Sequence, residues 1–132
     1  MKKHFSLIGI AALLLMIVGA GCKSGTATTP REVLSKFFSS AVSQDYAATY
    51  NCYYGAYKAK INKDEYIKHR KEASVLQSYD ILALNMEGNS AAHAEVKLTF
   101  APSEKLGRKE PISTVVKEEM VKENGEWKIK VW

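Results

Sequence analysis

Tyrosine is concentrated in one short stretch of this sequence. Five of the seven tyrosines lie within twelve residues, namely Tyr46, Tyr50, Tyr53, Tyr54 and Tyr57. Aromatic side chains with a polar tip suit a pocket for a sugar, a lipid or a peptide. Three of them also recur every four residues, which is the spacing of a helix face that packs into a core. The spacing favours packing, and ligand binding by these five tyrosines is the leading functional hypothesis.

Acid–base catalysis needs a titratable side chain with a partner in a buried site. The candidates are Asp45, Asp64, Asp80, His69 and His93. The first two stand at predicted helix starts, and both histidines lie among charged residues on predicted solvent faces. Asp80 alone could point inward, but no neighbour in the sequence singles it out. We therefore predict no catalytic residue.

Metal binding and thiol chemistry have few candidates. His93 and Glu95 share a strand face and could supply two ligands, but the sequence has no His-Glu-x-x-His and no paired Cys-x-x-Cys spacing. We predict neither a metal nor a cofactor. Cys52 lies among tyrosines with no base placed beside it, which favours a buried, unreactive thiol.

The N-terminus has the layout of a secretory signal, which we assign to residues 1–21. Lys2 and Lys3 precede Leu7–Val18, twelve uncharged residues that are too few for a permanent membrane span. Gly19-Ala20-Gly21 then leads into Cys22, and this arrangement resembles the lipobox of bacterial lipoproteins. The resemblance implies that Cys22 carries acyl chains such as palmitate and becomes the mature N-terminus. The alternative is an ordinary cleaved signal with an incidental cysteine.

Cleavage before Cys22 defines the remaining organisation. Residues 22–29 form a flexible tether with the lipidated cysteine, and residues 30–132 form one domain. Loss of Lys2 and Lys3 leaves 17 basic and 14 acidic residues, a net charge of +3, so we predict no nucleic-acid partner. The predicted location is the extracytoplasmic side of a bacterial membrane, held by the lipid anchor.

A basic run between residues 58 and 71 offers a second contact with that membrane. At helical spacing Lys63, Arg70 and Lys71 lie close together and could rest on anionic headgroups. The alternative is an ordinary solvated face.

Helices are predicted in the first half of the domain. Thr29 and Glu32 form a capping box around Pro30, and apolar residues follow at helical spacing: Val33, Leu34, Phe37, Phe38, Ala41 and Val42. Asp45 begins a second, short helix, which we expect Gly55 to end. Asn62 begins a third helix that extends to about Glu72.

Strands are predicted in the second half, because the apolar period changes from 3.6 to 2 after Ala73. The expected strands are Val75–Glu87, Ala92–Phe100, Ile112–Glu123 and Trp127 to the end, with turns at Gly88-Asn89 and Asn124-Gly125. Helices followed by an antiparallel meander predict an α+β fold, in which the N-terminal helices pack on a curved antiparallel sheet.

Three segments together resemble a known family. They are Thr29–Leu34 with Phe37-Phe38, the pair Asp45-Tyr46, and Glu123–Ile129. They are similar to small bacterial lipoproteins of the nuclear-transport-factor-2-like superfamily, and the resemblance covers Pro30–Trp132. It implies a cone-shaped α+β domain. These motifs are packing and turn residues, so they carry no chemistry.

The superfamily includes isomerases, dehydratases and cyclases with an Asp or His base inside the cone, and many members of unknown function. The leading hypothesis is a membrane-anchored, non-catalytic envelope lipoprotein that binds a small ligand or an envelope protein. The alternative is a superfamily enzyme, isomerase-like or dehydratase-like, that acts on a small exported substrate.

Overall fold

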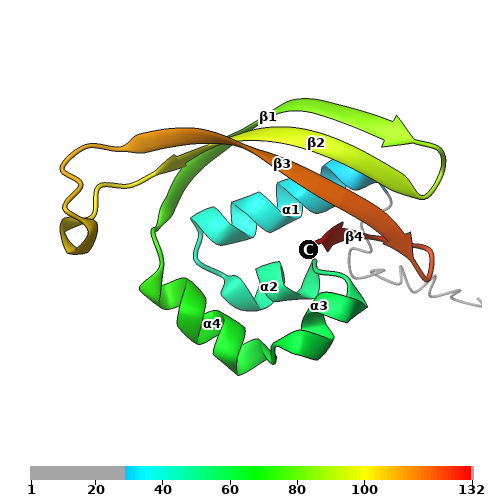
Figure 1. The fold of residues 1–132 in the computed structure, drawn as a ribbon, viewed down its shortest axis with the longest axis horizontal. Helices are drawn as coiled ribbons and strands as arrows, with labels where there is room; N and C mark the ends of the chain where they lie inside the picture. Colours follow the sequence, from blue (N-terminus) through cyan, green and yellow to red (C-terminus); the bar gives the residue numbers. More distant parts are fainter. Residues whose placement is uncertain (1–28, 132) are drawn as a thin grey trace, which may run out of the picture.

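The computed structural model describes residues 29–131, which form an α+β domain. The elements are α1 (Pro30–Val42), α2 (Tyr46–Asn51), α3 (Gly55–Lys60), α4 (Lys63–Glu72), β1 (Leu76–Glu87), β2 (Ala91–Phe100), the 3-10 turn η1 (Glu104–Leu106), β3 (Ile112–Glu123) and β4 (Glu126–Lys130). The sheet bends over α1, and the other helices lie on the same, concave side (Figure 1). This confirms the predicted fold class. The predictions for the signal, for Cys22 and for most of the tether lie outside the described residues.

Helix α1 begins and packs as its sequence predicts. The Thr29 side chain accepts a hydrogen bond from the Glu32 N–H, and the Glu32 carboxylate accepts one from the Thr29 N–H, at 3.2 and 3.0 Å. This capping box satisfies two backbone donors that the first helical turn leaves free. The apolar face of α1, which includes Leu34 and Phe38, is then buried in the core.

The sheet is an antiparallel meander in the order β1-β2-β3-β4. Alternation sets its two faces: in β2, Ala92, Ala94, Val96 and Leu98 are buried, and the residues between them face solvent. Asn124 and Gly125 both have positive φ, at 52° and 79°, as the predicted two-residue turn requires. This turn pairs β3 with β4 in a register that places Lys122 opposite Trp127 and Met120 opposite Ile129.

The prediction that Gly55 ends the second helix is wrong. Helix α2 already ends at Asn51, and Gly55 is the first residue of α3. The reason is tertiary: the chain between the two helices pairs with β4 in the parallel direction. The Ile129 N–H donates to the Cys52 carbonyl at 2.8 Å, and the Tyr54 N–H donates to the Ile129 carbonyl at 3.0 Å. These bonds replace those that would have continued α2.

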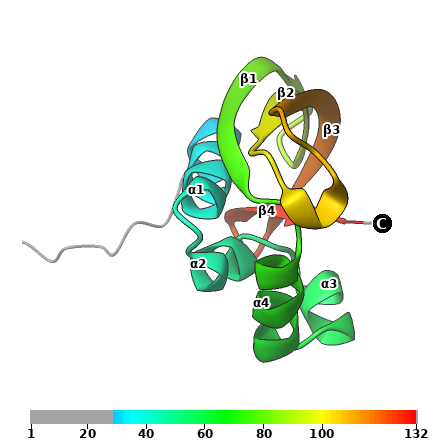
Figure 2. The ribbon, with the colours of Figure 1, turned by 90° about the vertical axis from the view of Figure 1, so that its left-hand side faces the viewer.

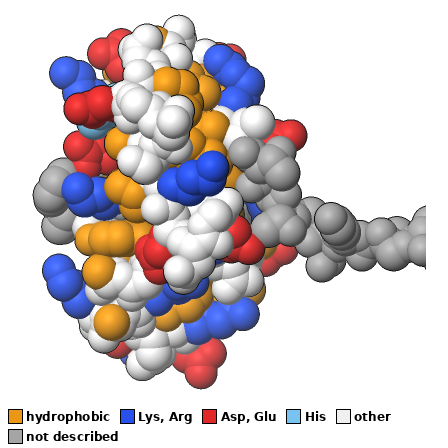
Figure 3. All heavy atoms as spheres, turned by 90° about the vertical axis from the view of Figure 1, so that its right-hand side faces the viewer, with side chains coloured by type: hydrophobic (Ala, Val, Ile, Leu, Met, Phe, Trp, Pro, Cys, Tyr) orange, Lys and Arg blue, Asp and Glu red, His pale blue; other side chains and the backbone are white. Residues whose placement is uncertain are grey.

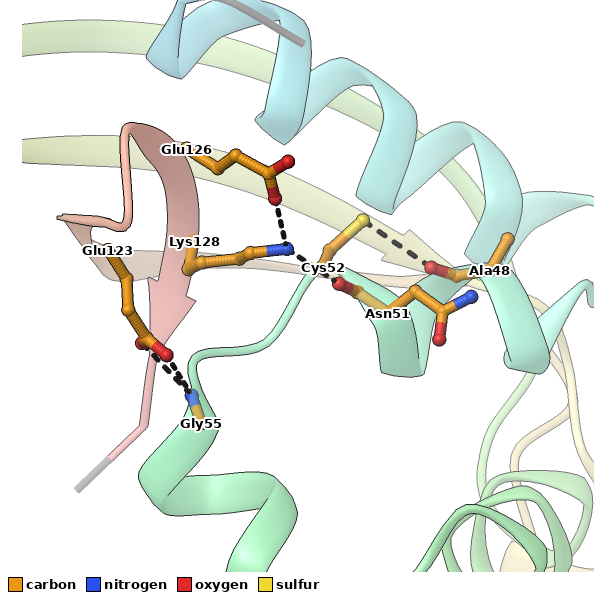
Figure 4. A network of polar contacts seen from close by, with 7 residues as sticks. All are labelled: Ala48, Asn51, Cys52, Gly55, Glu123, Glu126 and Lys128. Carbon is orange, nitrogen blue, oxygen red and sulfur yellow. Dashed lines mark hydrogen bonds and ion pairs between the residues drawn. The ribbon is translucent and has the colours of Figure 1, made fainter. Parts of the chain in front are cut away.

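Gly55 is needed here for a close approach. Its N–H lies 3.1 and 3.0 Å from the two carboxylate oxygens of Glu123, at the end of β3 (Figure 4). A Cβ at residue 55 would lie 2.7 Å from Glu123 Oε1. The absent side chain therefore lets a carboxylate bind the first N–H of α3, where negative charge is favoured.

Three further contacts in Figure 4 stabilise the same segment. The Lys128 ammonium donates to the Asn51 carbonyl at 3.4 Å and pairs with Glu126 at 3.1 Å. Cys52 is buried, and its thiol donates to the Ala48 carbonyl at 3.4 Å. Burial raises the pKa of this thiol, so the predicted burial is confirmed and the thiolate is disfavoured. These contacts position Tyr53, which is partly buried and packs against the core.

Among residues 29–131, no helix has both the length and the apolar composition needed to cross a membrane.

Candidate functional site: a charged, aromatic cavity under the sheet

A cavity of about 150 Å³ lies between the helices and the sheet, and we call it the inner cavity. Figure 2 shows the arrangement around it, with α1 beside β1 and with α2, α3 and α4 below the curled sheet. Six of its nine lining residues are apolar, and the other three carry polar side-chain atoms. The lining residues are Phe37, Phe38, Ala41, Tyr53, Arg70, Leu76, Leu98, Phe100 and Glu118. The three polar ones, Tyr53, Arg70 and Glu118, come from three different parts of the chain.

Glu118 reaches the cavity because of its place in β3. It pairs with Ala94, whose side chain is buried on the inner face, and it therefore shares that face with Val116 and Met120. Burial raises the pKa of this carboxyl to about 7. An acid that titrates near neutral pH in a cavity is a functional-site candidate.

No motif in the sequence singles out Glu118. A signal was available in the alternation of β3, because Glu118 stands at strand spacing between the apolar residues Val116 and Met120. A carboxylate at a core-facing strand position is the exception that such a pattern can reveal.

Arg70 brings a permanent positive charge to the cavity. Its guanidinium lies 5.7 Å from the ring centroid of Tyr46, and its Nε is buried without a hydrogen-bond partner. In the part of the chain that the structure describes, no carboxylate forms an ion pair with it. A partly buried guanidinium normally has an acidic partner. The lack of one within residues 29–131 makes Arg70 a candidate ligand-binding group.

Tyr53 lies beside a pair of hydrogen-bonded hydroxyl groups, those of Thr49 and Tyr66. Thr49 donates its only hydroxyl proton to the Tyr46 carbonyl at 2.8 Å, so in its 3.0 Å contact with Tyr66 the tyrosine is the donor. Burial first, and then Tyr66 by its charge and its hydrogen bond, raise the pKa of Tyr53.

The other predicted tyrosines have structural roles around the cavity. Tyr46 is buried beneath Arg70. The Tyr50 hydroxyl donates to the Ile61 carbonyl at 2.9 Å, and the Tyr54 hydroxyl donates to the Val131 carbonyl at 2.7 Å. Tyr57 packs against Tyr53, with ring centroids 4.6 Å apart. Of the five predicted ligand-binding tyrosines, only Tyr53 lines the inner cavity.

The three predicted membrane-surface residues do not share one environment. Lys63 and Lys71 are exposed, whereas Arg70 turns inward and lines the cavity. Acidic residues of the same helix, Asp64 and Glu72, lie around a shallow depression that also includes Lys71. Figure 3 shows a similar mixture on one face of the molecule, where acidic, basic and apolar side chains are interspersed.

The candidates considered for acid–base or metal chemistry lie away from this cavity. Asp80 is exposed on β1 opposite Lys97, and His93 is exposed and pairs with Glu87. Asp45 caps α2 by accepting a hydrogen bond from the Ala48 N–H at 3.1 Å. Over residues 29–131, no group of three or more His, Cys, Asp and Glu side chains is arranged to hold a metal ion.

Solved structures share this architecture at low sequence identity. A SEC-C motif containing protein from Rhodopseudomonas palustris matches with a TM-score of 0.67 and 15% identity, over 82% of this chain and 80% of that one. Another, from Psychrobacter arcticus, matches with a TM-score of 0.65 and 13% identity, over 81% of this chain and 61% of that one. An NTF-2-like protein of unknown function from Shewanella oneidensis matches with a TM-score of 0.50 and 16% identity, over 75% of this chain and 89% of that one. The fold is nuclear-transport-factor-2-like.

No protein-family model and no curated protein matches this sequence. The nuclear-transport-factor-2-like fold agrees with the expectation drawn from the capping, packing and turn motifs. In this domain the residues that line the inner cavity come from α1, the α2–α3 segment, α4 and the sheet.

Proposed function

We propose that this protein is a lipid-anchored envelope domain that captures a small ligand in its inner cavity without transforming it. The observation that carries the proposal is the pair of charged groups that the cavity holds without partners. The buried Arg70 Nε has no hydrogen-bond partner, and burial raises the pKa of Glu118 with no opposing cation. Unpaired polar groups in an apolar cavity cost stability, and proteins keep them chiefly at functional sites.

Native mass spectrometry of protein extracted from its own membrane tests ligand capture. We expect a small-molecule mass on the wild-type protein. Ala41→Leu should remove it, because Ala41 lines the cavity and the added carbons would fill much of its 150 Å³. Ala59→Leu, on the exposed surface of α3, is the matched control and should keep the ligand. Wild-type protein that carries only its acyl chains would contradict the proposal.

Acid–base catalysis is the second candidate, and the pKa of Glu118 near 7 is the observation that favours it. The same experiment separates the two functions. In a binding domain, Glu118→Gln should carry the same ligand mass as the wild type. In an enzyme, the variant should accumulate unreacted substrate and carry a different mass.

Lipid anchoring rests on the signal layout and on the short distance between Cys22 and the domain. Seven residues separate Cys22 from the start of α1 at Pro30, a reach of about 25 Å at full extension. Two acyl chains would hold the domain stably beside the bilayer, with Lys63 and Lys71 available to anionic headgroups.

Replacement of Cys22 by serine should release the protein from the membrane fraction or leave it unprocessed, because serine has no thiol to acylate. Membrane fractionation and gel migration measure both outcomes. Cys52→Ser is the control, since the Cys52 thiol is buried, and it should leave the protein membrane-bound. A Cys22→Ser protein that fractionates and migrates like the wild type would show that Cys22 is not the anchor.

A further inference from the structure

The charge balance of the inner cavity is unusual and points to the chemistry of its ligand. An arginine side chain carries a permanent positive charge, and Arg70 brings one to the cavity wall. Its guanidinium contacts the face of Tyr46 at 5.7 Å, and within residues 29–131 it pairs with no acid. A ring face attracts a cation but does not neutralise it. The wall therefore keeps a positive charge that a ligand can meet.

The other titratable groups on the wall do not cancel this charge. Burial raises the pKa of Tyr53 and of Tyr57 beside it, so both phenols are neutral at pH 7. Burial raises the pKa of Glu118, and within residues 29–131 no basic side chain forms an ion pair with its carboxylate. Below pH 7 the cavity consequently carries a net positive charge.

The apolar part of the wall sets the shape and size of the ligand. Phe37 packs edge to face with Phe38 at 5.0 Å and with Tyr53 at 5.2 Å, and this aromatic corner forms one side of the cavity. The volume of about 150 Å³ is that of a protein cavity that accepts one benzene molecule. A ligand of this size has one compact apolar body.

We infer that the inner cavity selects small monocarboxylates with a compact apolar body, which place the carboxylate on Arg70 and the body against Phe37 and Tyr53. This inference rests on the proposed function, since it names the class of ligand captured there. A guanidinium binds a carboxylate through two parallel N–H donors, and an ammonium cannot reproduce that geometry.

Equilibrium dialysis of benzoate and of benzamide against the full protein in neutral-lipid nanodiscs tests the inference, with empty nanodiscs as the blank. The two probes have nearly the same shape and differ in charge. We expect benzoate to bind at least tenfold more tightly than benzamide. Arg70→Gln should reduce that ratio to about one, and Arg70→Lys should leave an intermediate ratio.

Lys68→Gln is the matched control, because Lys68 is exposed on the same helix and its loss removes the same charge. The tenfold preference should survive in this variant. The ratio is measured within each variant, so a general loss of affinity does not imitate the expected result. Benzamide binding in Arg70→Gln also shows that the cavity is still formed.

The pH dependence of benzoate binding provides a second, independent test. In the inner cavity, α4 brings Arg70 to Glu118 and the α2–α3 segment brings Tyr53. Glu118 also borders a second depression whose titratable or charged side chains are His93, Glu95, Lys117, Glu119 and Lys130. Benzoate stays ionised between pH 6 and pH 8, and ionised Glu118 repels it. Benzoate should therefore bind severalfold more tightly at pH 6 than at pH 8, and Glu118→Gln should abolish that difference.

Three results would overturn the inference. They are equal binding of the two probes by the wild type, a preference for benzoate that Arg70→Gln leaves unchanged, and no benzoate binding. A ligand mass lost in Ala41→Leu would still support capture in each case, so failure of the carboxylate class and failure of the proposed function are separable.

Discussion

Replacement of Trp127 by alanine should lower the free energy of unfolding by about 3–5 kcal/mol. Trp127 is the first inward residue of β4, only 5% exposed, and it belongs to the same core as Leu34, Val96 and fully buried Ile129. Truncation leaves a void between β4 and α1 that a rigid interior cannot close. Since small domains are stable by about 5–15 kcal/mol, this loss is a large fraction of the total.

Urea unfolding followed by far-ultraviolet circular dichroism measures the loss without relying on tryptophan fluorescence. Leu82→Ala is the matched control, because Leu82 is 53% exposed and its truncation should change stability by no more than about 0.5 kcal/mol. An unchanged unfolding midpoint for Trp127→Ala would mean that β4 presents its other face to the core.

Replacement of Glu118 by glutamine should stabilise the domain at pH 8 by about 2–3 kcal/mol and leave its stability at pH 4 unchanged. The carboxyl has a pKa of about 7 in the folded domain, against 4.5 for an unperturbed glutamate. The folded state therefore holds its proton more tightly than the unfolded chain. Its contribution to stability is fully present below pH 4.5 and is lost as the pH rises to about 7.

The free energy of unfolding of the wild-type domain should therefore fall between pH 4.5 and about pH 7. In the Glu118→Gln domain this fall should be smaller by about 2–3 kcal/mol. Urea unfolding at pH 4, 6 and 8 measures the slope. Glu95→Gln, at an exposed position on the opposite face of the sheet, should keep the wild-type slope. If Glu118→Gln is no more stable than wild type at pH 8, the carboxylate is compensated and the cavity is not charged as described.

A gain in stability from so conservative a change would show that the ionised Glu118 carboxylate lowers the free energy of unfolding. Proteins commonly accept such costs where binding or catalysis needs a polar group in an apolar site. The same variant removes the pH dependence expected for benzoate binding, so one substitution connects the stability of the cavity with its chemistry.

Much of the fold could be predicted because its signals are local. The capping box at Thr29 and Glu32, the apolar face of α1 and the Asn124-Gly125 turn depend only on residues a few positions apart. The alternation in β2 likewise identifies the buried face of that strand without knowledge of its neighbours. These features determine an α+β domain with a curved meander, and the structure confirms it.

The break between α2 and α3 could not be predicted in this way. A glycine after a short helix favours a stop, and locally that expectation is sound. The chain begins a new helix at Gly55 because Ile129, far away in sequence, takes up the backbone groups of Cys52 and Tyr54. Pairing with β4 decides where the helices start and end.

The candidate site was decided by the tertiary structure alone. Tyr53, Arg70 and Glu118 lie far apart in the sequence, and neither charged member stands in a recognisable motif. Arg70 belongs to a run of basic residues that predicts a solvated face, and only the packing of α4 over Tyr46 turns its guanidinium inward. Local patterns determine which residues are apolar and where the chain turns. Which charges share a cavity depends on how the helices cross the sheet, and that is a property of the packed core.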